Sequence, residues 1–403
     1  MQHTDLCYAY FMKKAFIALL LLLVILPLFS SNQEDLDYLI ATLPKVHKNF
    51  FNNRTEAELS AFISEIDEVE GLSDMEFYYL LSSICTFAED SHTGVSLQTI
   101  PDELQLLPLR FIAFSDGLFV YASNKEHDEL LGYKLIGVNG YSVNRIKEKA
   151  SSVLPHDNEV FLFSQLTANL IYPDFLKKIG VVSDYSNGIL LTFEKDGSIR
   201  SIVVEPVSIA EENGSGYQMI FQSFPVTYAS GYYRGFELSD SAFFIQYNTC
   251  QDSPEMSVSD FTSLVQTELE KKQYEKVIVD FRYNGGGNSS LFEPFMDYLS
   301  SYDASVYGLI GSGTFSSGIM NALYLKEKCS AVLVGTPSGG CVNAFGELGF
   351  FPLPSGRFSV LYSTEYFYQS GDYEGVLTPD VTIETTFSDF LSLIDREVEY
   401  CLK

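Results

Sequence analysis

Residues 306–320 read VYGLIGSGTFSSGIM, a pattern that predicts a buried strand, a tight glycine turn and a helix that continues to Lys326. Ser316 stands where the strand gives way to the helix. The turn exposes its hydroxyl, and the first helical N–H groups face any negative charge that develops beside it. Ser316 is therefore a candidate nucleophile. The alternative interpretation is a helix cap, a position that serine favours.

Strands of the same buried type are predicted on either side of this segment, at 276–281 and 331–335, and a helix is predicted at 258–272. Alternation of strand and helix predicts an α/β layer architecture for this part of the chain. The polar, glycine-containing stretch Glu211–Gly216 precedes it and is typical of a linker between domains.

The part of the chain before this linker divides into two patterns. Residues 34–88 carry apolar side chains at three- and four-residue intervals, which predicts helices, with a new helix starting near Ser73. Residues 96–206 show mainly strand signals, with a helical interlude at 159–179. We interpret the second pattern as a β-rich module.

The composition indicates a globular protein of two or three domains. Of 403 residues, 46% are hydrophobic and 14% aromatic, enough to fill sizeable cores. Lys and Arg number 25 against 53 Asp and Glu, which gives a formal net charge of -28. Such a charge argues against nucleic acid and anionic membrane surfaces as partners.

The N-terminus has the three parts of a secretory signal peptide. Met12-Lys13-Lys14 precede an apolar run at 15–29, and small residues follow at Ser30 and Ser31. The run is shorter than the roughly 20 residues that a membrane-spanning helix needs. We therefore predict secretion or a place in the cell envelope, with no integral membrane domain beyond this segment; an uncleaved membrane anchor is the alternative.

Several kinds of site are excluded by their missing motifs. The chain has no phosphate-binding loop, no dinucleotide fingerprint and no G-x-S-x-G elbow. The 6 cysteines are scattered without a C-x-x-C pair, and Asp90 and His92 lack a visible third ligand, so no metal site is predicted. We expect no cofactor and no disulfide framework, although one or two disulfides remain open.

Four parts of the chain together resemble one family, the carboxy-terminal processing (tail-specific) serine peptidases. The resemblance covers nearly the whole chain after the signal segment. The matching stretches are Asp90-Ser91-His92-Thr93, residues 116–120 with 131–140, residues 280–287 (DFRYNGGG), and residues 314–318 with 334–340.

This resemblance implies both the fold and the division of the chain. It implies an α/β fold with a crotonase-like (ClpP/crotonase) catalytic core at 211–403, a helical N-terminal region at 32–95 and a β-rich PDZ-like module at 96–210. Residues 1–31 form the signal peptide region. The expected partner is a protein or peptide substrate, and the oligomeric state is open.

The resemblance also assigns the nucleophile and its base. Ser316 occupies the position of the nucleophilic serine, but the position of the lysine base in the Ser-Lys branch holds Cys341. A neutral thiol cannot replace an amine as base. The chain is thus more similar to the tricorn-core-like branch, in which His92 would be the base, about 3 Å from the Ser316 hydroxyl. The other histidines are interpreted as partly exposed loop residues: His3, His47, His127 and His156.

Further roles follow from the same resemblance. Glu374 matches the glutamate that orients the histidine, and Glu347 is the competitor, because the pair only needs a buried carboxylate near the second ring nitrogen. The backbone N–H groups of Gly286 and Ser317 would bind the oxyanion.

These assignments predict an exported serine endopeptidase that works through an acyl-enzyme. The rival hypothesis is an inactive relative that binds peptides or an apolar ligand, favoured by Cys341 in the lysine position and by Thr336 in a Gly-x-Pro turn. A third hypothesis is a structural cell-surface protein.

Overall fold

The structure is a computed structural model that describes residues 31–221, 225, 227–228 and 230–403. The predicted signal segment, apart from Ser31, lies outside these residues. Within them, no helix has the length and apolar character needed to cross a membrane.

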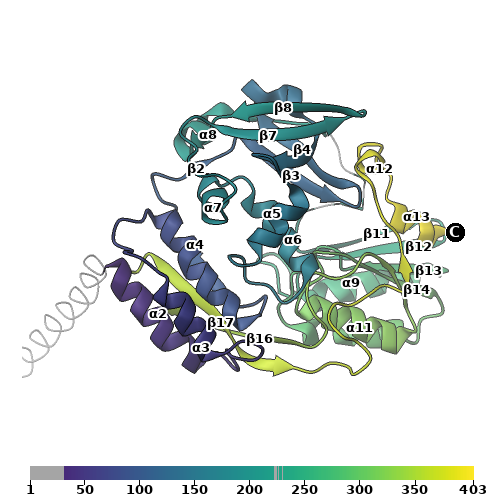
Figure 1. Cartoon of the computed structure of the whole chain (residues 1–403). Helices are drawn as coiled ribbons and strands as arrows, with labels where there is room; N and C mark the ends of the chain where they lie inside the picture. Colours follow the sequence, from purple (N-terminus) through teal and green to yellow (C-terminus); the bar gives the residue numbers. More distant parts are fainter. Residues whose placement is uncertain (1–30, 222–224, 226, 229) are drawn as a thin grey trace, which may run out of the picture.

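A sheet of six strands forms the centre of the C-terminal part of the described chain (Figure 1). The first strand is antiparallel to the second, and all the others run parallel. In spatial order the strands are β11 (Tyr233–Ser239), β12 (Ala242–Tyr247), β13 (Lys276–Asp280), β14 (Ser305–Ile310), β15 (Val332–Gly335) and β18 (Val381–Thr382).

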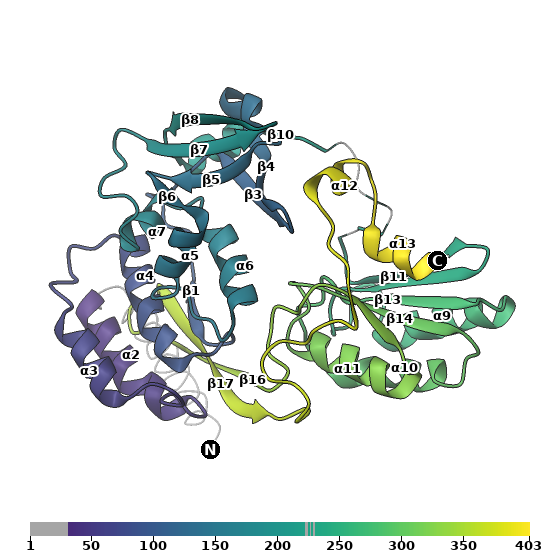
Figure 2. The same ribbon diagram turned by 45° about the vertical axis from the view of Figure 1, so that its right-hand side comes forward.

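Helices cover both faces of this sheet, as Figure 2 shows. Side chains of α9 (Val258–Lys271), α10 (Glu293–Leu299) and α11 (Ser317–Cys329) pack on one face. Val398 and Cys401 of α13 (Arg396–Leu402) pack on the other face, against Phe244 and Leu309. The layered α/β arrangement predicted from the alternating pattern is confirmed.

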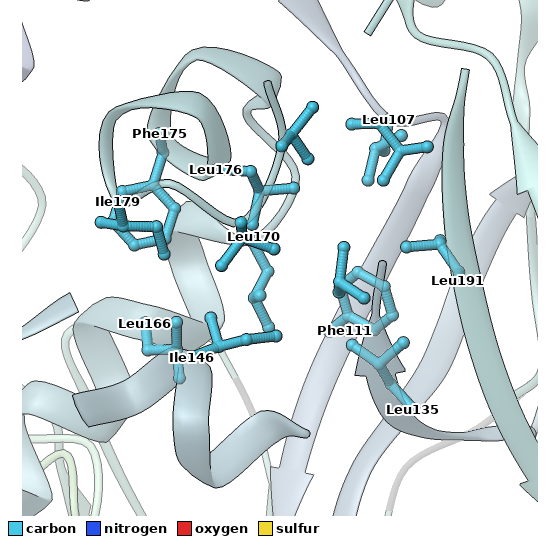
Figure 3. Close-up of a cluster of buried hydrophobic side chains, with 14 of the residues drawn as sticks. Leu107, Phe111, Leu135, Ile146, Leu166, Leu170, Phe175, Leu176, Ile179 and Leu191 are labelled. Atoms are coloured by element: carbon cyan, nitrogen blue, oxygen red, sulfur yellow. The ribbon is translucent and has the colours of Figure 1, made fainter. Parts of the chain in front are cut away.

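The β-rich part is built on a second sheet, whose order is β10-β4-β5-β7-β8, with β3 paired to β4 and β6 to β5. Helices α5, α6 and α7 pack on it, and their leucine and isoleucine side chains interleave with those of the strands (Figure 3). The elements are β3 (Leu109–Phe114), β4 (Gly117–Asn124), η3 (Lys125–Leu130), β5 (Lys134–Val138), β6 (Tyr141–Ser142), α5 (Val143–Ala150), α6 (Glu159–Asn169), α7 (Pro173–Lys178), β7 (Ile189–Lys195), β8 (Ser198–Val204) and β10 (Tyr217–Met219).

The N-terminal helices were predicted and are confirmed. They are α2 (Asn32–Val46), α3 (Glu56–Ser64) and α4 (Asp74–Cys85), and the short η2 (Thr86–Ala88) follows. Each of the three α-helices begins with a capping box, in which the side chains of a serine or threonine and a glutamate satisfy N-terminal N–H groups. These local signals explain why their starts are readable from the sequence.

These helices pack on a sheet that takes two strands from much later in the chain. Strand β1 (Gly94–Leu97) pairs with β17 (Phe358–Phe367), which pairs with β16 (Ala344–Pro352). Figure 1 shows β17 beside the N-terminal helices, and Phe358 and Val360 belong to the same hydrophobic cluster as Leu39 and Leu81. The β16–β17 hairpin therefore joins the C-terminal part of the chain to the N-terminal helical region.

One element contradicts the sequence analysis. The stretch Glu211–Gly216, predicted as a linker, lies mostly within helix α8 (Ile209–Ser215). The prediction was wrong because Ser208 and Glu211 form a capping box, a helix-start signal that the polar composition concealed. The remaining elements are β2 (Gln105–Leu106), which pairs with β9 (Val207–Ser208), η4 (Ser289–Leu291) and α12 (Phe387–Leu391).

Candidate functional site

Two loops meet at the edge of the six-stranded sheet where β13 and β14 end. Because these strands are parallel neighbours, their carboxyl ends lie side by side. Hydrogen bonds tie the loops together: the Phe315 N–H donates to the Asn284 carbonyl at 2.9 Å, and the Thr314 hydroxyl donates to the Phe281 carbonyl at 2.9 Å. The segment around Ser316 is thus held against the glycine-rich segment 285–287.

Ser316 has a strained backbone and is not a conventional helix cap. Its φ of 50° and ψ of -125° lie outside the regions that residues with a Cβ ordinarily adopt. It occupies the N-cap position of α11, yet its side chain makes no capping hydrogen bond. Such strain costs about 1–3 kcal/mol, and residues that keep it cluster at active sites. The capping interpretation does not describe this serine.

Gly286 lies in direct contact with Ser316. It has a φ of 104°, and a Cβ added there would lie 2.8 Å from the Ser316 Cβ and 3.1 Å from the Ser317 nitrogen. Both the backbone conformation and the short approach therefore require glycine. This approach brings the peptide group between Gly286 and Gly287 next to the candidate nucleophile.

The free backbone donors beside Ser316 differ in part from the predicted pair. The Gly286 N–H, predicted as an oxyanion donor, already donates to the Asn284 Oδ1 at 2.9 Å. The N–H groups of Gly287 and Ser317 donate no hydrogen bond to any residue that the structure describes. In addition, the Ser317 hydroxyl donates to the Gly287 carbonyl at 2.7 Å, which fixes these two peptides relative to each other.

His92 lies beside this turn, although 223 positions separate it from Phe315 in the chain (315 − 92). Its ring packs against the Phe315 ring, with centroids 4.5 Å apart and planes tilted by 31°. Its side chain is only 10% exposed, and neither ring nitrogen has a hydrogen-bond partner among the described residues. The hydrogen bond expected between His92 and Ser316 is therefore not formed in this structure, but the two residues share one site.

A carboxylate does face His92, and it belongs to Asp90. The Asp90 Oδ1 lies 3.7 Å from the His92 Nδ1, and the aspartate side chain is fully buried. Burial alone would raise the pKa of Asp90, but hydrogen bonds from His47, Ser363 and Thr93, together with the nearby His92, outweigh it and hold that pKa well below its usual range. Asp90 is therefore an ionised group inside the protein.

The two glutamates singled out by the sequence lie elsewhere. Glu374 is exposed on the loop before β18, and Glu347 is exposed on β16 with a φ of 55°. No hydrogen bond or ion pair joins the side chain of either glutamate to another described residue. The structure thus does not bring either carboxylate to His92.

The interpretation of the other histidines as loop residues is wrong for two of them. His47 is buried and its Nε2 lies 3.2 Å from the Asp90 Oδ2, and His127 is buried within η3. His47 follows helix α2. The burial of both histidines depends on residues far away in the chain, which a local sequence pattern does not reveal. His156 is half-buried, with its Nδ1 2.7 Å from the Leu154 carbonyl, and His3 lies outside the described residues.

Cys341, in the position where the Ser-Lys branch has its base, is a half-buried neutral thiol. Burial, with Asp157 nearby, raises its pKa to about 12. Its Sγ accepts a hydrogen bond from the Asn158 amide at 3.8 Å, and its S–H donates to the Asp157 carbonyl at 3.9 Å. A thiol in this state is not a general base at neutral pH. All five cysteines in the described part of the chain are free.

The segment around Asp157 and Asn158 belongs to the site, and the sequence analysis missed it. The Ser91 hydroxyl donates to the Asp157 Oδ1 at 2.5 Å, and the Asn158 amide donates to the Gly339 carbonyl at 2.9 Å. This segment of the β-rich part thus connects the His92 loop to the turn beside Ser316. The sequence predicted only a helical interlude that begins at residue 159. Asn158 caps that helix, and a capping residue gives no sign of a long-range contact.

A polar pocket of about 720 Å³ opens next to this segment. Its walls come from all three parts of the chain, including Arg54, His156, Asn158, Cys341 and Gly375. Polar side chains dominate the lining. The pocket thus offers hydrogen-bonding groups beside the segment that connects the His92 loop to the turn, although neither Ser316 nor His92 lines it.

A buried cluster of charged side chains lies next to the two loops of the site. The Arg282 guanidinium binds Asp280 at 2.8 Å and Asp395 at 2.8 Å, and Glu397 lies 3.5 Å away. The backbone of Arg282 also lies close to the turn before Ser316. A Cβ added to Gly313 would lie 2.5 Å from the Arg282 carbonyl oxygen. The cluster therefore joins α13 to both loops of the site.

The pKa of Glu397 in this cluster gives a testable pH dependence. Burial raises the pKa from 4.5 to about 7, more than Arg282 lowers it. As the pH rises from about 4.5 to about 7 the unfolded chain loses this proton first, so the wild-type protein loses on the order of 2–3 kcal/mol of stability across that window. Glu397→Gln is expected to remove this loss. Urea unfolding at pH 5 and pH 8 checks it; equal pH dependence in wild type and variant would contradict it.

In the described residues, no group of three histidine, cysteine, aspartate or glutamate side chains is arranged to hold a metal ion.

Comparisons with known proteins bear on the fold. No family model matches the chain, and no curated protein matches its sequence. A structure of mature CPAF complexed with lactacystin matches 92% of this chain and 96% of that chain, with a TM-score of 0.66 and 15% identity. A structure of mature CPAF alone matches 93% and 96%, with a TM-score of 0.65 and 15% identity.

The photosystem II D1 C-terminal processing protease matches 88% of this chain and 94% of its own, with a TM-score of 0.43 and 12% identity. The two CPAF structures show that this chain shares the overall mixed α/β fold of CPAF along nearly its whole length.

Proposed function

We propose that this protein is a serine endopeptidase of the carboxy-terminal processing type. The observation that carries the proposal is the strained backbone of Ser316 at the carboxyl edge of a parallel sheet, next to Gly286 and beside the buried ring of His92. Strain of this kind persists only where the surroundings enforce it, and it clusters at reacting residues. The shared fold with CPAF supports the same conclusion.

The reaction would proceed by acyl transfer. The Ser316 Oγ attacks the carbonyl carbon of the peptide bond while the His92 Nε2 takes the hydroxyl proton. The N–H groups of Gly287 and Ser317 stabilise the oxyanion, because they are the donors without a partner at this turn. His92 then gives the proton to the leaving amine, and water hydrolyses the acyl-enzyme with the same base.

Several finer features belong to this proposal. They are a histidine-based mechanism like that of the tricorn core peptidase, a crotonase-like core at 211–403, a PDZ-like module at 96–210, a helical region at 32–95, and export through the signal region at 1–31 to the outside or the cell envelope. The polar pocket beside Asn158 supports a protein or peptide substrate.

Labelling with a serine-directed fluorophosphonate probe tests the proposal. The wild-type chain is expected to react at one serine, identified by peptide mass spectrometry as Ser316. Ser316→Ala should not react, and His92→Ala should react at least about 10³-fold more slowly, because the hydroxyl then lacks its base. Equal labelling of the three proteins would refute the proposal.

A second candidate is a peptide-binding protein without turnover. It is favoured by the missing hydrogen bond between Ser316 and His92 and by the neutral thiol of Cys341. Peptide binding by the unlabelled wild-type chain, unchanged by Ser316→Ala, would support this candidate.

A further inference from the structure

The two oxygens of the Asp90 carboxylate have different environments. Oδ2 accepts three hydrogen bonds, from the His47 Nε2 at 3.2 Å, the Thr93 hydroxyl at 2.6 Å and the Ser363 hydroxyl at 2.6 Å. Oδ1 accepts one, from the backbone N–H of His92 at 2.9 Å. Since Oδ1 accepts only this one bond from the described residues, it has acceptor capacity left, and the unpartnered His92 Nδ1 lies 3.7 Å from it.

The direction of the bond from His47 follows from its other nitrogen. The backbone N–H of Asn49 donates to the His47 Nδ1 at 3.1 Å, so that nitrogen carries no proton. The proton is then on Nε2, which donates it to Asp90. His47 is therefore a neutral donor, and the rings of Phe50 and Phe345 pack against it and fix its orientation.

The donors to the Asp90 Oδ2 come from three segments, two of which are far from Asp90 in the chain. His47 ends helix α2, Thr93 precedes β1, and Ser363 lies on β17. An isolated buried carboxylate would become protonated, but four donated hydrogen bonds stabilise the charged form. The packing of the N-terminal helices on the β16–β17 hairpin thus creates a place for one ionised carboxylate, directly beside the ring of His92.

We propose that Asp90 is the positioning residue of the site: its Oδ1 accepts a hydrogen bond from the His92 Nδ1–H and so leaves the His92 Nε2 unprotonated to take the proton of Ser316. Neither Glu374 nor Glu347 takes part. The Nδ1 to Oδ1 distance of 3.7 Å becomes a hydrogen bond when the ring moves by roughly 1 Å. The step to Ser316 rests on the proposed function, whereas the tautomer of His92 does not.

The test measures the tautomer directly. In the full chain labelled with ¹⁵N in its histidine rings, long-range ¹H–¹⁵N spectra report which nitrogen carries the proton. The His92 signals are identified by their loss in His92→Gln. The wild-type His92 is expected to carry its proton on Nδ1 near neutral pH.

Asp90→Asn is expected to move that proton. Three donors at Oδ2 keep the amide oxygen on their side, so the new NH₂ group takes the place of Oδ1. There it donates to the His92 Nδ1 and leaves the His92 backbone N–H without its acceptor. The His92 proton should then be on Nε2, and fluorophosphonate labelling of Ser316 should slow by about 10³–10⁴-fold, as expected for the wrong tautomer.

Asp174→Asn is the matched control. Asp174 is a buried aspartate of α7 that accepts a hydrogen bond from the Tyr185 hydroxyl. Its replacement by asparagine also removes a buried carboxylate, but at a place away from the site. This control should leave the His92 tautomer and the labelling rate unchanged. If Asp90→Asn does not fold, the wild-type spectrum alone decides.

The outcomes separate the two proposals. A proton on Nε2 in the wild type, an unchanged tautomer in Asp90→Asn, or a tautomer change in Glu374→Gln or Glu347→Gln would overturn the role of Asp90. If the wild-type proton is on Nδ1 and moves in Asp90→Asn, but Ser316 never reacts with the probe, Asp90 still positions His92 and only the peptidase proposal fails.

Discussion

Replacing Arg282 with methionine is expected to lower the free energy of unfolding by about 3–5 kcal/mol, because it leaves buried carboxylates without their partner. Arg282 is 6% exposed and makes two-pronged contacts with both Asp280 and Asp395. Methionine fills a similar volume but neutralises neither charge. Urea unfolding at pH 7, followed by circular dichroism, measures the loss.

Arg396→Met is the matched control for this prediction. Arg396 is next to Asp395 in the chain and begins helix α13, but its own side chain is exposed and its ion pairs with Asp389 and Glu399 are partly or fully open to water. Exposed ion pairs contribute little, since water solvates both partners and salt screens them. The two variants should therefore differ strongly in stability. If they unfold at the same urea concentration, the Arg282 cluster does not stabilise the fold in the way described.

Two replacements of Ser316 are expected to abolish activity and yet to differ in stability. Ser316→Ala and Ser316→Gly both remove the hydroxyl, so peptide hydrolysis should fall by on the order of 10⁴-fold or more. Alanine keeps a Cβ at a φ of 50° and thus keeps the backbone strain, which glycine relieves. After allowing for the greater freedom of glycine in the unfolded chain, Ser316→Gly should be more stable than Ser316→Ala by about 1 kcal/mol.

Ser312 provides the control within the same turn. It is exposed and its φ is not positive, so Ser312→Gly should destabilise the protein relative to Ser312→Ala by about 0.5–1 kcal/mol. Hydrolysis should continue in both Ser312 variants. The sign of the glycine effect should therefore reverse between positions 312 and 316. Thermal unfolding of the four variants measures it; the same sign at both positions would show that Ser316 is not strained.

Many elements of the fold could be predicted from the sequence because their signals are local. The N-terminal helices are indicated by the spacing of apolar residues and by capping boxes, both of which involve residues only three or four positions apart. The strands that end at Asp280 and Ile310 are short buried runs followed by glycines. The prediction of a linker at Glu211–Gly216 was wrong because it relied on the polar composition of the stretch and overlooked the local capping box that starts a helix there.

The site could be predicted only in part. Motifs singled out Ser316 and His92 as candidates, and the structure places the His92 ring against Phe315, the residue before Ser316. The same motifs pointed to Glu374 and Glu347, which the structure leaves exposed. A motif gives the position of a carboxylate in the chain, but its role as an orienting group depends on burial and on a distance to the histidine, which are set by segments far away.

The amino-acid sequence by itself determined the layered α/β core, the N-terminal helices and the turn that carries Ser316, because periodicity and capping act over a few neighbouring residues. The tertiary structure decided which carboxylate faces His92. That choice required β1 to pair with β17, so that Ser363 and His47 could occupy one oxygen of Asp90 and leave the other free. Hydrogen-bond capacity in a buried site depends on every donor around it, and here the donors come from opposite ends of the chain.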